Sequence, residues 1–290
     1  MSLMLYCDLH THSTASDGST APADLGPLAR QAGLAAVALT DHDTTAGLAD
    51  AAASCAALDI AFVPGIELSC QRGKSFGTLH LLGYFIDPVS PTLAAVCAEL
   101  QQARNERAPQ IVAKLNELRV DITLDEVLAE SGGNSGGGRG SVGRPHIGAV
   151  LVRKGYVKTI KDAFTRYIGH GAPAYVRKDN LAPQRAIAAV HDAGGLAVLA
   201  HPVQLRCDDD EELLELIRSL RDAGLDGLEC RHCDHTPALT RQYQHLAKRF
   251  DLIPTGGSDF HGLRKAVPLG AARVPITCYE SLLNAHQAVR

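Results

Sequence analysis

Histidines and carboxylates recur where short apolar runs end, and their spacing is typical of metal ligands. Residues 8–12 read Asp-Leu-His-Thr-His, which places His10 and His12 two positions apart. Side chains two apart on a strand point to the same face, so both imidazoles can reach one ion. Asp259 and His261 repeat this spacing. Imidazole suits zinc and iron, and carboxylate suits manganese and magnesium, so these pairs predict a divalent-metal site.

Metal-ligand side chains also mark four other predicted strands. The second strand ends at His42, the third at Glu67 and the fifth at His201, while the fourth contains His80. In parallel barrels, functional residues gather at the C-terminal ends of the strands. One such residue alone is more often a turn residue, a surface acid or a core histidine. Together, on six of seven predicted strands, they predict a metal centre.

The elements that must position these residues alternate between strand and helix. This order predicts an α/β fold in which crossover helices connect parallel strands. Seven strands are predicted, one fewer than in the standard barrel: 3–9, 36–40, 60–68, 78–86, 196–200, 227–230 and 252–255. The helices predicted beside them lie at 22–31, 46–58, 183–193, 209–223 and 237–250.

One long segment interrupts this alternation. Residues 91–178 are helical in pattern, and a plain crossover connection of this length is uncommon. We therefore expect an inserted helical cap at 91–178, on a barrel formed by residues 1–90 and 179–290.

Local signals subdivide the predicted cap. Residues 91–118 form a helical pattern, which Pro109 is expected to kink or divide. Thr123 and Glu126 have the spacing of a capping box at the start of a short helix. The remaining predicted cap elements are a glycine-rich loop at 131–140 and helices near 145–153 and 159–168.

Composition narrows the function classes. The 290 residues carry a formal charge of −4, which argues against a basic coat for long nucleic acid. No apolar run approaches the roughly 18 residues of a membrane span, and no signal peptide is evident at the start. The eight cysteines are scattered and are interpreted mainly as small buried hydrophobes, which fits a cytoplasmic protein.

The motifs Asp-Leu-His-Thr-His-Ser, Thr-Asp-His, Gly-Ile-Glu, Ala-His-Pro and Gly-Ser-Asp-Phe-His-Gly, in this order, resemble those of the PHP (polymerase and histidinol phosphatase) family. The resemblance implies a distorted seven-stranded (β/α)7 barrel with two or three metal ions. Ser-Asp-Gly after the first motif, the inserted cap, and Gly-Arg-Pro-His at 143–146 are similar to members that hydrolyse nucleoside 3′,5′-bisphosphates or short RNA.

The resemblance also implies a set of ligands for each ion. The first ion would take His10, His12, Glu67 and Asp259. Glu67 would bridge to a second ion, held also by His80 and His201. A third ion would take Asp17, His42 and His261. Mn²⁺ is the expected metal, with Zn²⁺, Fe²⁺ and Mg²⁺ as alternatives. Asp8 and Asp41 would lie behind the ligands and orient their imidazoles; the alternative for Asp8 is that it reaches a metal itself.

The reaction implied is hydrolysis of the 3′-phosphate of a small nucleotide by a hydroxide that bridges the first two ions. The catalytic residues would be Glu67, His201, Asp259 and His261, and His201, His261 or a water at the third ion would assist the leaving oxygen. Expected substrate contacts are Arg144, Arg177, Lys178 and His235, and further cationic candidates are Arg104, Arg107 and Arg139. Arg144 ranks first because it precedes Pro145 at a predicted helix start, where anions bind.

Other functions remain open from the sequence. One is a 5′→3′ exonuclease on short 5′-phosphorylated RNA. Others are a phosphatase like histidinol phosphatase, an amide or lactone hydrolase, and a non-catalytic proofreading module. The expected partner is a small phosphorylated nucleotide, with neither long nucleic acid nor a membrane. The histidines expected to have structural or solvated roles are His146, His170, His191, His245 and His286.

Overall fold

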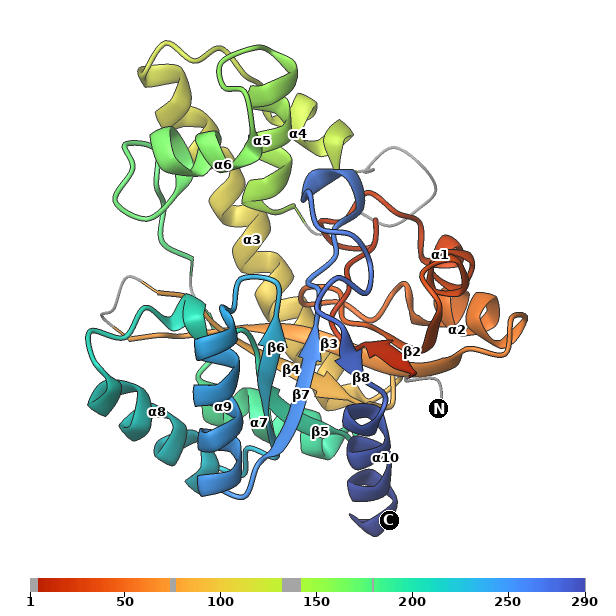
Figure 1. Ribbon diagram of the computed structural model, residues 1–290. Coiled ribbons are helices and arrows are strands. Elements are labelled where there is room, and N and C mark those ends of the chain that lie inside the picture. Colours follow the sequence, from red (N-terminus) through yellow and green to blue (C-terminus); the bar gives the residue numbers. More distant parts are fainter. Residues whose placement is uncertain (1–4, 74–76, 132–141, 179, 290) are drawn as a thin grey trace.

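The structure is a computed structural model that describes residues 5–73, 77–131, 142–178 and 180–289. Its strands form one sheet in the order β7-β6-β5-β4-β3-β2-β1-β8. They are β1 (Tyr6–Asp8), β2 (Leu34–Leu39), β3 (Ala61–Cys70), β4 (Leu79–Tyr84), β5 (Leu196–Leu199), β6 (Gly227–His232), β7 (Ile253–Gly257) and β8 (Val274–Pro275). The sheet curves, and a group of helices lies above one end of it (Figure 1).

Helices pack around the outside of the sheet because each has one apolar side. In α8 the buried residues Leu213, Ile217 and Leu220 recur at helical spacing. The helices around the barrel are α1 (Leu25–Gln31), α2 (Leu48–Ala56), α7 (Pro183–Asp192), α8 (Asp210–Asp222), α9 (Pro237–Arg249) and α10 (Thr277–Val289). Within the described residues, no helix has the length and apolar character needed to span a membrane.

The sheet is mixed, and the prediction of parallel strands throughout was wrong. Strand β4 runs antiparallel to both β3 and β5. Only residues 71–78 join β3 to β4, and a parallel crossover needs a dozen or more residues. This reversal serves the site, because it places the start of β4 beside the end of β3, with His80 opposite Ser69.

The sheet has eight strands instead of the seven predicted. Strand β8 is only two residues long and pairs antiparallel with β1, and the helix α10 that follows it was not predicted either. Beyond the ends of β1 and β7 the chain continues to pair, since Thr11 forms a parallel bridge with Phe260. The two sides of the sheet therefore meet, and the sheet nearly closes into a barrel.

The cap is a cluster of helices with its own apolar core. It contains α3 (Pro91–Glu117), α4 (Leu124–Glu130), α5 (Arg144–Arg153), α6 (Ile160–Ala163) and a π-helical turn, η2 (Phe164–Ile168). Pro109 lies inside α3, which is one continuous helix, so the predicted division does not occur. The predicted capping box of Thr123 and Glu126 is confirmed. The predicted glycine-rich loop, with Arg139, lies outside the described residues except for Ser131.

Helix α3 belongs to two cores. Its first half packs Leu93, Val96, Cys97 and Leu100 into the barrel core. Its second half, from Ala108 onward, packs into a separate cluster with the other cap helices. A single long helix therefore joins the cap to the barrel, and Figure 1 shows it rising from the sheet into the cap. The boundary at residue 91 stays a prediction, since the packing changes over only beyond Leu100.

Candidate metal centre

Two histidines follow β1 and point into the barrel. The segment stays extended because the backbone amide of Asp259 donates to the carbonyl of His10 over 2.9 Å. Thr11 faces the other way and donates its hydroxyl to the carbonyl of Ala38. His10 and His12 therefore share the inner face, and both are buried.

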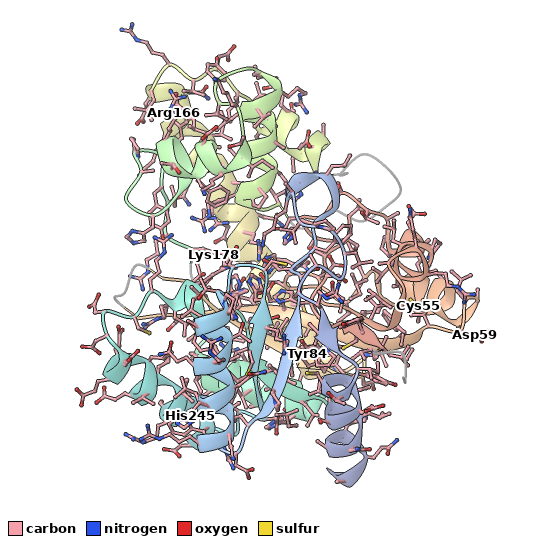
Figure 2. All side chains as sticks on the ribbon, viewed as in Figure 1. Cys55, Asp59, Tyr84, Arg166, Lys178 and His245 are labelled. Carbon is pink, nitrogen blue, oxygen red and sulfur yellow. The ribbon has the colours of Figure 1, made fainter. Side chains whose placement is uncertain are left out.

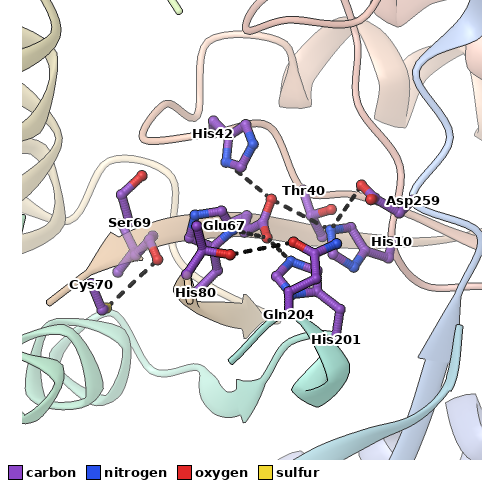
Figure 3. Close-up of polar contacts among 12 residues, drawn as sticks. His10, Thr40, His42, Glu67, Ser69, Cys70, His80, His201, Gln204 and Asp259 are labelled. Atoms are coloured by element: carbon purple, nitrogen blue, oxygen red, sulfur yellow. Dashed lines mark hydrogen bonds and ion pairs between the residues drawn. The ribbon is translucent and has the colours of Figure 1, made fainter. Parts of the chain in front are cut away.

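Glu67, near the end of β3, lies at the centre of the cluster (Figure 3). Its Oε1 lies 2.8 Å from Nδ1 of His80 and 2.9 Å from Nε2 of His201. Its Oε2 faces three further nitrogens: Nδ1 of His42 at 3.0 Å, Nε2 of His12 at 3.3 Å and Nε2 of His10 at 3.4 Å. One carboxylate thus stands between two groups of imidazoles, which is the geometry of a bridging ligand.

A second carboxylate, Asp17, faces another set of imidazoles. Its Oδ1 lies 3.3 Å from Nε2 of His261, and its Oδ2 lies 3.8 Å from Nε2 of His42. The turn that delivers Asp17 requires Gly18, because a Cβ there would lie 2.5 Å from the carbonyl oxygen of His12. The Ser-Asp-Gly motif is therefore a tight turn that folds an acid back over the end of β1.

Asp259 completes the cluster from the end of β7. Its Oδ1 lies 3.2 Å from Nε2 of His12 and 3.5 Å from Nε2 of His10. Its close approach needs Gly257, where a Cβ would lie 2.2 Å from the Cβ of His10. Nδ1 of His261 lies 2.9 Å from the carbonyl oxygen of Asp259, which can only accept. His261 therefore carries its proton on Nδ1 in the neutral ring and turns the lone pair of Nε2 toward Asp17.

The donor atoms fit divalent cations. Buried polar atoms normally find a hydrogen-bond partner. Here Nε2 of His10, both nitrogens of His12, Nδ1 of His42, Oε2 of Glu67 and Nδ1 of His201 are buried without one. Among the described residues, four convergent groups have their donor atoms within 4.8 Å of one another: His10-His12-Glu67, His42-Glu67-His80, His12-Asp17-His42-His261 and His10-Glu229-His232. These groups overlap the predicted ligand sets, but they do not divide the residues in the same way: His42 belongs to two groups, and the predicted ligands Asp259 and His201 contact the cluster from outside the groups.

The electrostatics of the cluster favour positive charge. Burial raises the pKa of Glu67, but the imidazoles of His42, His80 and His10 outweigh it and hold that pKa well below its usual value. Burial lowers the pKa of His12, but Asp259 and Glu67 outweigh it and raise the value to about 10. Carboxylates that stay ionised, and rings that retain protons beside them, mark a place where a cation is stabilised.

The two acids expected to orient imidazoles hold other groups instead. Asp8 accepts from the backbone amides of Ser258 and Gly270 at 2.8 and 2.7 Å. Asp41 accepts from the backbone and hydroxyl of Ser13 and the hydroxyl of Ser16. Both acids therefore fix loops that carry ligands, and the described hydrogen bonds connect neither acid to an imidazole.

A buried acid that accepts from the imidazole of His10, a predicted ligand, was missed. Glu229, in the middle of β6, lies 3.0 Å from Nδ1 of His10. The signal available in the sequence was a single acid between Leu228 and Cys230 in an apolar strand. His235 was expected to contact substrate, but its ring donates from Nδ1 to the carbonyl of Cys230 and lies against Tyr243, outside the cavity lining.

The cluster opens into a cavity of about 380 Å³ between barrel and cap. We call its barrel side the floor: Asp17, His42, Glu67, His80, His201, Asp259 and His261. We call its cap side the cationic wall: Arg104, Arg107, Arg144, Arg177 and Lys178. Figure 2 shows Lys178 at the level where the cap meets the barrel.

Asp43 anchors the cationic wall to the barrel. Its Oδ2 lies 2.7 Å from Nε of Arg104 and 3.3 Å from Nζ of Lys178. Ser69 donates its backbone amide and hydroxyl to the same carboxylate at 2.9 and 3.0 Å. Burial lowers the pKa of Arg107, and its neighbours Arg144 and Arg104 lower it further. The wall is thus crowded with positive charge, which a bound anion would relieve.

Arg144, which ranks first among the substrate contacts predicted from the sequence, is fixed at the start of α5. Its guanidinium lies over the rings of Phe164 and Tyr175, 5.1 and 5.7 Å from their centroids, and donates to the carbonyl of Ile168 at 3.3 Å. A stacked guanidinium keeps its plane fixed while its other donors stay available. Arg177 is exposed at the cavity rim, whereas Lys178 is nearly buried.

Comparison with known proteins agrees with this geometry. The chain is 35% identical over 259 residues to a 3′,5′-nucleoside bisphosphate phosphatase of Chromobacterium violaceum, covering 89% of this chain and 88% of that protein. It is 33% identical over 255 residues to a 5′-3′ exoribonuclease of Haemophilus influenzae, covering 88% and 89%. It is 34% identical over 271 residues to a phosphoribosyl 1,2-cyclic phosphate 1,2-diphosphodiesterase of Eggerthella lenta, covering 92% and 98%.

A solved structure from Bifidobacterium adolescentis, assigned as a metal-dependent phosphoesterase, superposes with a TM-score of 0.87. It is 32% identical, and the match covers 97% of this chain and 96% of that one. Together with these similarities, the nearly closed α/β barrel and its His/Asp/Glu cluster place the protein among hydrolases of the phosphoesterase kind. The sequence-family model of the PHP domain matches residues 8–253, and the chain belongs to the PHP family.

Proposed function

We propose that this protein removes the 3′-phosphate from nucleoside 3′,5′-bisphosphates. The observation that carries the proposal is one cavity with two kinds of anion site, the floor on the barrel side and the cationic wall on the cap side. A volume of about 380 Å³ suits a mononucleotide, since small-molecule sites span roughly 300–1,000 Å³. The similarity to a 3′,5′-nucleoside bisphosphate phosphatase supports the same substrate class.

The floor would receive the phosphate that is cleaved. Bound divalent cations, with Mn²⁺ as our expectation, would supply an activated water, neutralise the phosphoryl oxygens and stabilise the leaving oxygen. Glu67 separates two groups of imidazoles and so sets the spacing of the ligand groups. Burial lowers the pKa of His201, so this ring is neutral and keeps a lone pair available near neutral pH.

Asp259 and His261 would act as a pair at the other side of the floor. The Nδ1 proton of His261 is donated to the Asp259 carbonyl, so its Nε2 lone pair is oriented toward the cavity floor. Asp259 holds its carboxylate between His10 and His12 on one side and Lys265 on the other. Both residues are therefore held in place before substrate arrives, which is what electrostatic stabilisation of a transition state requires.

The cationic wall would hold the 5′-phosphate. A guanidinium fork matches the oxygens of a phosphate, and Arg144 has its plane set by two aromatic rings. Lys178 and Arg104 share Asp43, so the wall keeps a net positive charge after that pairing. A substrate with phosphates at both ends of the ribose would use floor and wall together.

A second candidate is the 5′→3′ exonuclease reaction on short 5′-phosphorylated RNA. It is favoured by similarity to an exoribonuclease at nearly the same identity and coverage. The same two sites would serve: the wall would hold the 5′-phosphate, and a water activated at the floor would attack the adjoining diester, with the 3′ oxygen of the first nucleotide as the leaving group. A phosphatase acting on histidinol phosphate would gain nothing from the wall, because its substrate has one phosphate.

A substrate panel separates these functions. The Mn²⁺-loaded protein is assayed with adenosine 3′,5′-bisphosphate, 3′-AMP, 5′-AMP, histidinol phosphate and a 5′-phosphorylated RNA trimer. We expect kcat/KM for the bisphosphate to exceed that for 3′-AMP by about tenfold or more, the value of one or two charged hydrogen bonds. Equal values for the two would refute the role of the wall. If mononucleotide is released from the trimer faster than phosphate is released from the bisphosphate, the exonuclease is established instead.

A further inference from the structure

Strand β6 supplies none of the predicted metal ligands, yet it carries a buried acid and a buried imidazole beside the floor. These are Glu229, which is fully buried, and His232, which is 4% exposed. Residues three apart on a regular strand point to opposite faces. The pairing of β6 with β7 shifts between Glu229 and Arg231, so an extra residue is inserted there. This bulge turns both Glu229 and His232 toward the site.

Glu229 holds two different parts of the metal cluster. Nδ1 of His10 donates to its Oε1 over 3.0 Å, so the lone pair of His10 Nε2 is directed at Glu67 and Asp259. The backbone amide of His201 donates to its Oε2 over 2.6 Å. His201 has a φ of 23°, a left-handed conformation that is costly for a residue with a side chain. One carboxylate therefore fixes the tautomer of one ligand and the strained backbone of another.

His232 faces Asp259 from the same strand, in an ion-pair contact and not in a hydrogen bond. Its Nδ1 accepts from the backbone amide of Asp234 over 3.0 Å, so in the neutral ring the proton is on Nε2. Nε2 faces Oδ2 of Asp259 at 3.4 Å, and Nζ of Lys265 lies 2.7 Å from that same oxygen. Oδ2 is thus held from behind, which leaves Oδ1 directed at His10 and His12.

We propose that Glu229 and His232 are positioning residues that tune the affinity of the metal centre, an inference that rests on the proposed metal-dependent function. The donor atoms of His10, Glu229 and His232 lie within 4.8 Å of one another, so a direct metal site there is the competing assignment. Both oxygens of Glu229 already accept from protein donors, which favours the positioning role. Such outer partners typically change metal affinity by about 10- to 100-fold.

The test is titration of metal-stripped protein with Mn²⁺ by calorimetry, without substrate. Glu229→Gln keeps the shape, but its amide can accept from only one of the two donors and turns an NH₂ group toward the other. We expect the affinity to fall about 10- to 100-fold while the number of ions bound at saturation is unchanged. Unchanged affinity would overturn the proposal. The loss of one ion at saturation would also overturn it, because it would make Glu229 a ligand.

The chain offers a matched control at Asp226, directly before the same strand. Asp226 accepts from Nε2 of His191 at 2.8 Å and from the backbone amide of Ala197 at 2.7 Å, so it repeats the pattern of one imidazole and one amide away from the metal cluster. Asp226→Asn should leave Mn²⁺ affinity at the native value. A fall equal to that of Glu229→Gln would assign the effect to general loosening of the barrel.

His232 gives an independent pair of variants if Glu229→Gln does not fold. His232→Leu removes the imidazole Nε2 that faces Asp259 and should lower Mn²⁺ affinity, whereas His232→Gln places an amide N–H near the position of Nε2 and should restore it. Equal affinities for these two variants would contradict the positioning role. Because no substrate is present, these outcomes are independent of whether the bisphosphate proves to be the substrate.

Discussion

The floor and the cationic wall differ in charge, in origin and in how they are held. The floor consists of acids and imidazoles in or just beyond the strands, and neighbouring strands fix their positions through backbone pairing. The wall consists of cations from α3, α5 and the segment at 177–178, and a single buried acid, Asp43, ties two of them to the barrel. The barrel therefore preorganises the chemistry, while recognition depends on how the cap is docked.

The largest expected effect comes from breaking the floor at its centre. Glu67→Gln removes the charge that faces five imidazoles, and we expect kcat to fall by at least about 10³-fold, comparable to the loss of an electrostatic stabiliser of the transition state. The number of Mn²⁺ ions bound per chain should fall with it, as measured by metal analysis after gel filtration.

Glu99→Gln is the matched control for that variant. Glu99 is also a carboxylate in an ion pair, with Nη2 of Arg185 at 2.9 Å, but it lies on the surface of α3. Surface pairs contribute about 0–1 kcal/mol, so its kcat and metal content should stay native. Full activity of Glu67→Gln with native metal content would contradict the role given to the floor.

The next effect concerns the joint between wall and barrel. Asp43→Asn leaves the buried charges of Arg104 and Lys178 without their carboxylate, and breaking a buried pair costs about 3–5 kcal/mol. We expect the free energy of unfolding, measured in urea, to fall by about this amount. Adding Arg104→Gln to Asp43→Asn should recover part of the loss; simple additivity of the two would show that the pair is not the cause.

The residues of the floor could be predicted from the sequence better than those of the wall. Floor residues were found because period-two spacing and strand ends are patterns within a few neighbouring residues. His10 with His12, and Asp259 with His261, each form such a pattern over three residues. Glu229 was missed because the bulge that turns it inward exists only in the pairing of β6 with β7. The direction of β4 was missed because a continuous apolar run does not encode orientation.

The sequence offered candidate cations for the wall, but it could not show which of them face the site. Arg104 and Arg107 lie on α3, and which face of that helix turns toward the site depends on the docking of the cap, which involves contacts distant in sequence such as Arg104 with Asp43. His235 follows β6 as closely as other site residues follow their strands, yet its ring turns back against Tyr243. Position in the sequence was therefore enough to find the floor residues, but not to find which residues line the wall.

Breaking the wall alone should change recognition and leave chemistry intact. Arg144→Ala removes one charged hydrogen-bond donor, so KM for adenosine 3′,5′-bisphosphate should rise about 10- to 100-fold with kcat nearly unchanged. KM for 3′-AMP should not change, because that substrate has no second phosphate. Arg166→Ala is the control, since Arg166 lies high on the cap, far from Lys178 (Figure 2), and rests on Tyr167. A fall in kcat alone would place Arg144 in the chemistry.

The smallest effect is a pH dependence confined to the wall. Burial lowers the pKa of Lys178 to about 7, Arg104 lowers it in the same direction, and Asp43 opposes both. Above pH 7 the amine loses its proton, while a phosphate with its second pKa near 6 is already doubly charged. The ratio of kcat/KM for the bisphosphate to that for 3′-AMP should therefore fall about three- to tenfold between pH 6.5 and 9. Titration of the floor affects both substrates and cancels in this ratio.

Lys178→Arg sharpens this prediction, because arginine stays charged across the range and should make the ratio independent of pH. Linkage supplies a second, opposite readout. Since the folded-state pKa of Lys178 lies below the unfolded value, the unfolded chain binds more protons between about pH 7 and 10, so this residue makes stability rise with pH there. The native protein should thus gain stability over the interval in which it loses preference for the second phosphate, and Lys178→Arg should lose both trends together. A ratio that falls equally in the variant would show that a group other than Lys178 titrates at the site of the second phosphate.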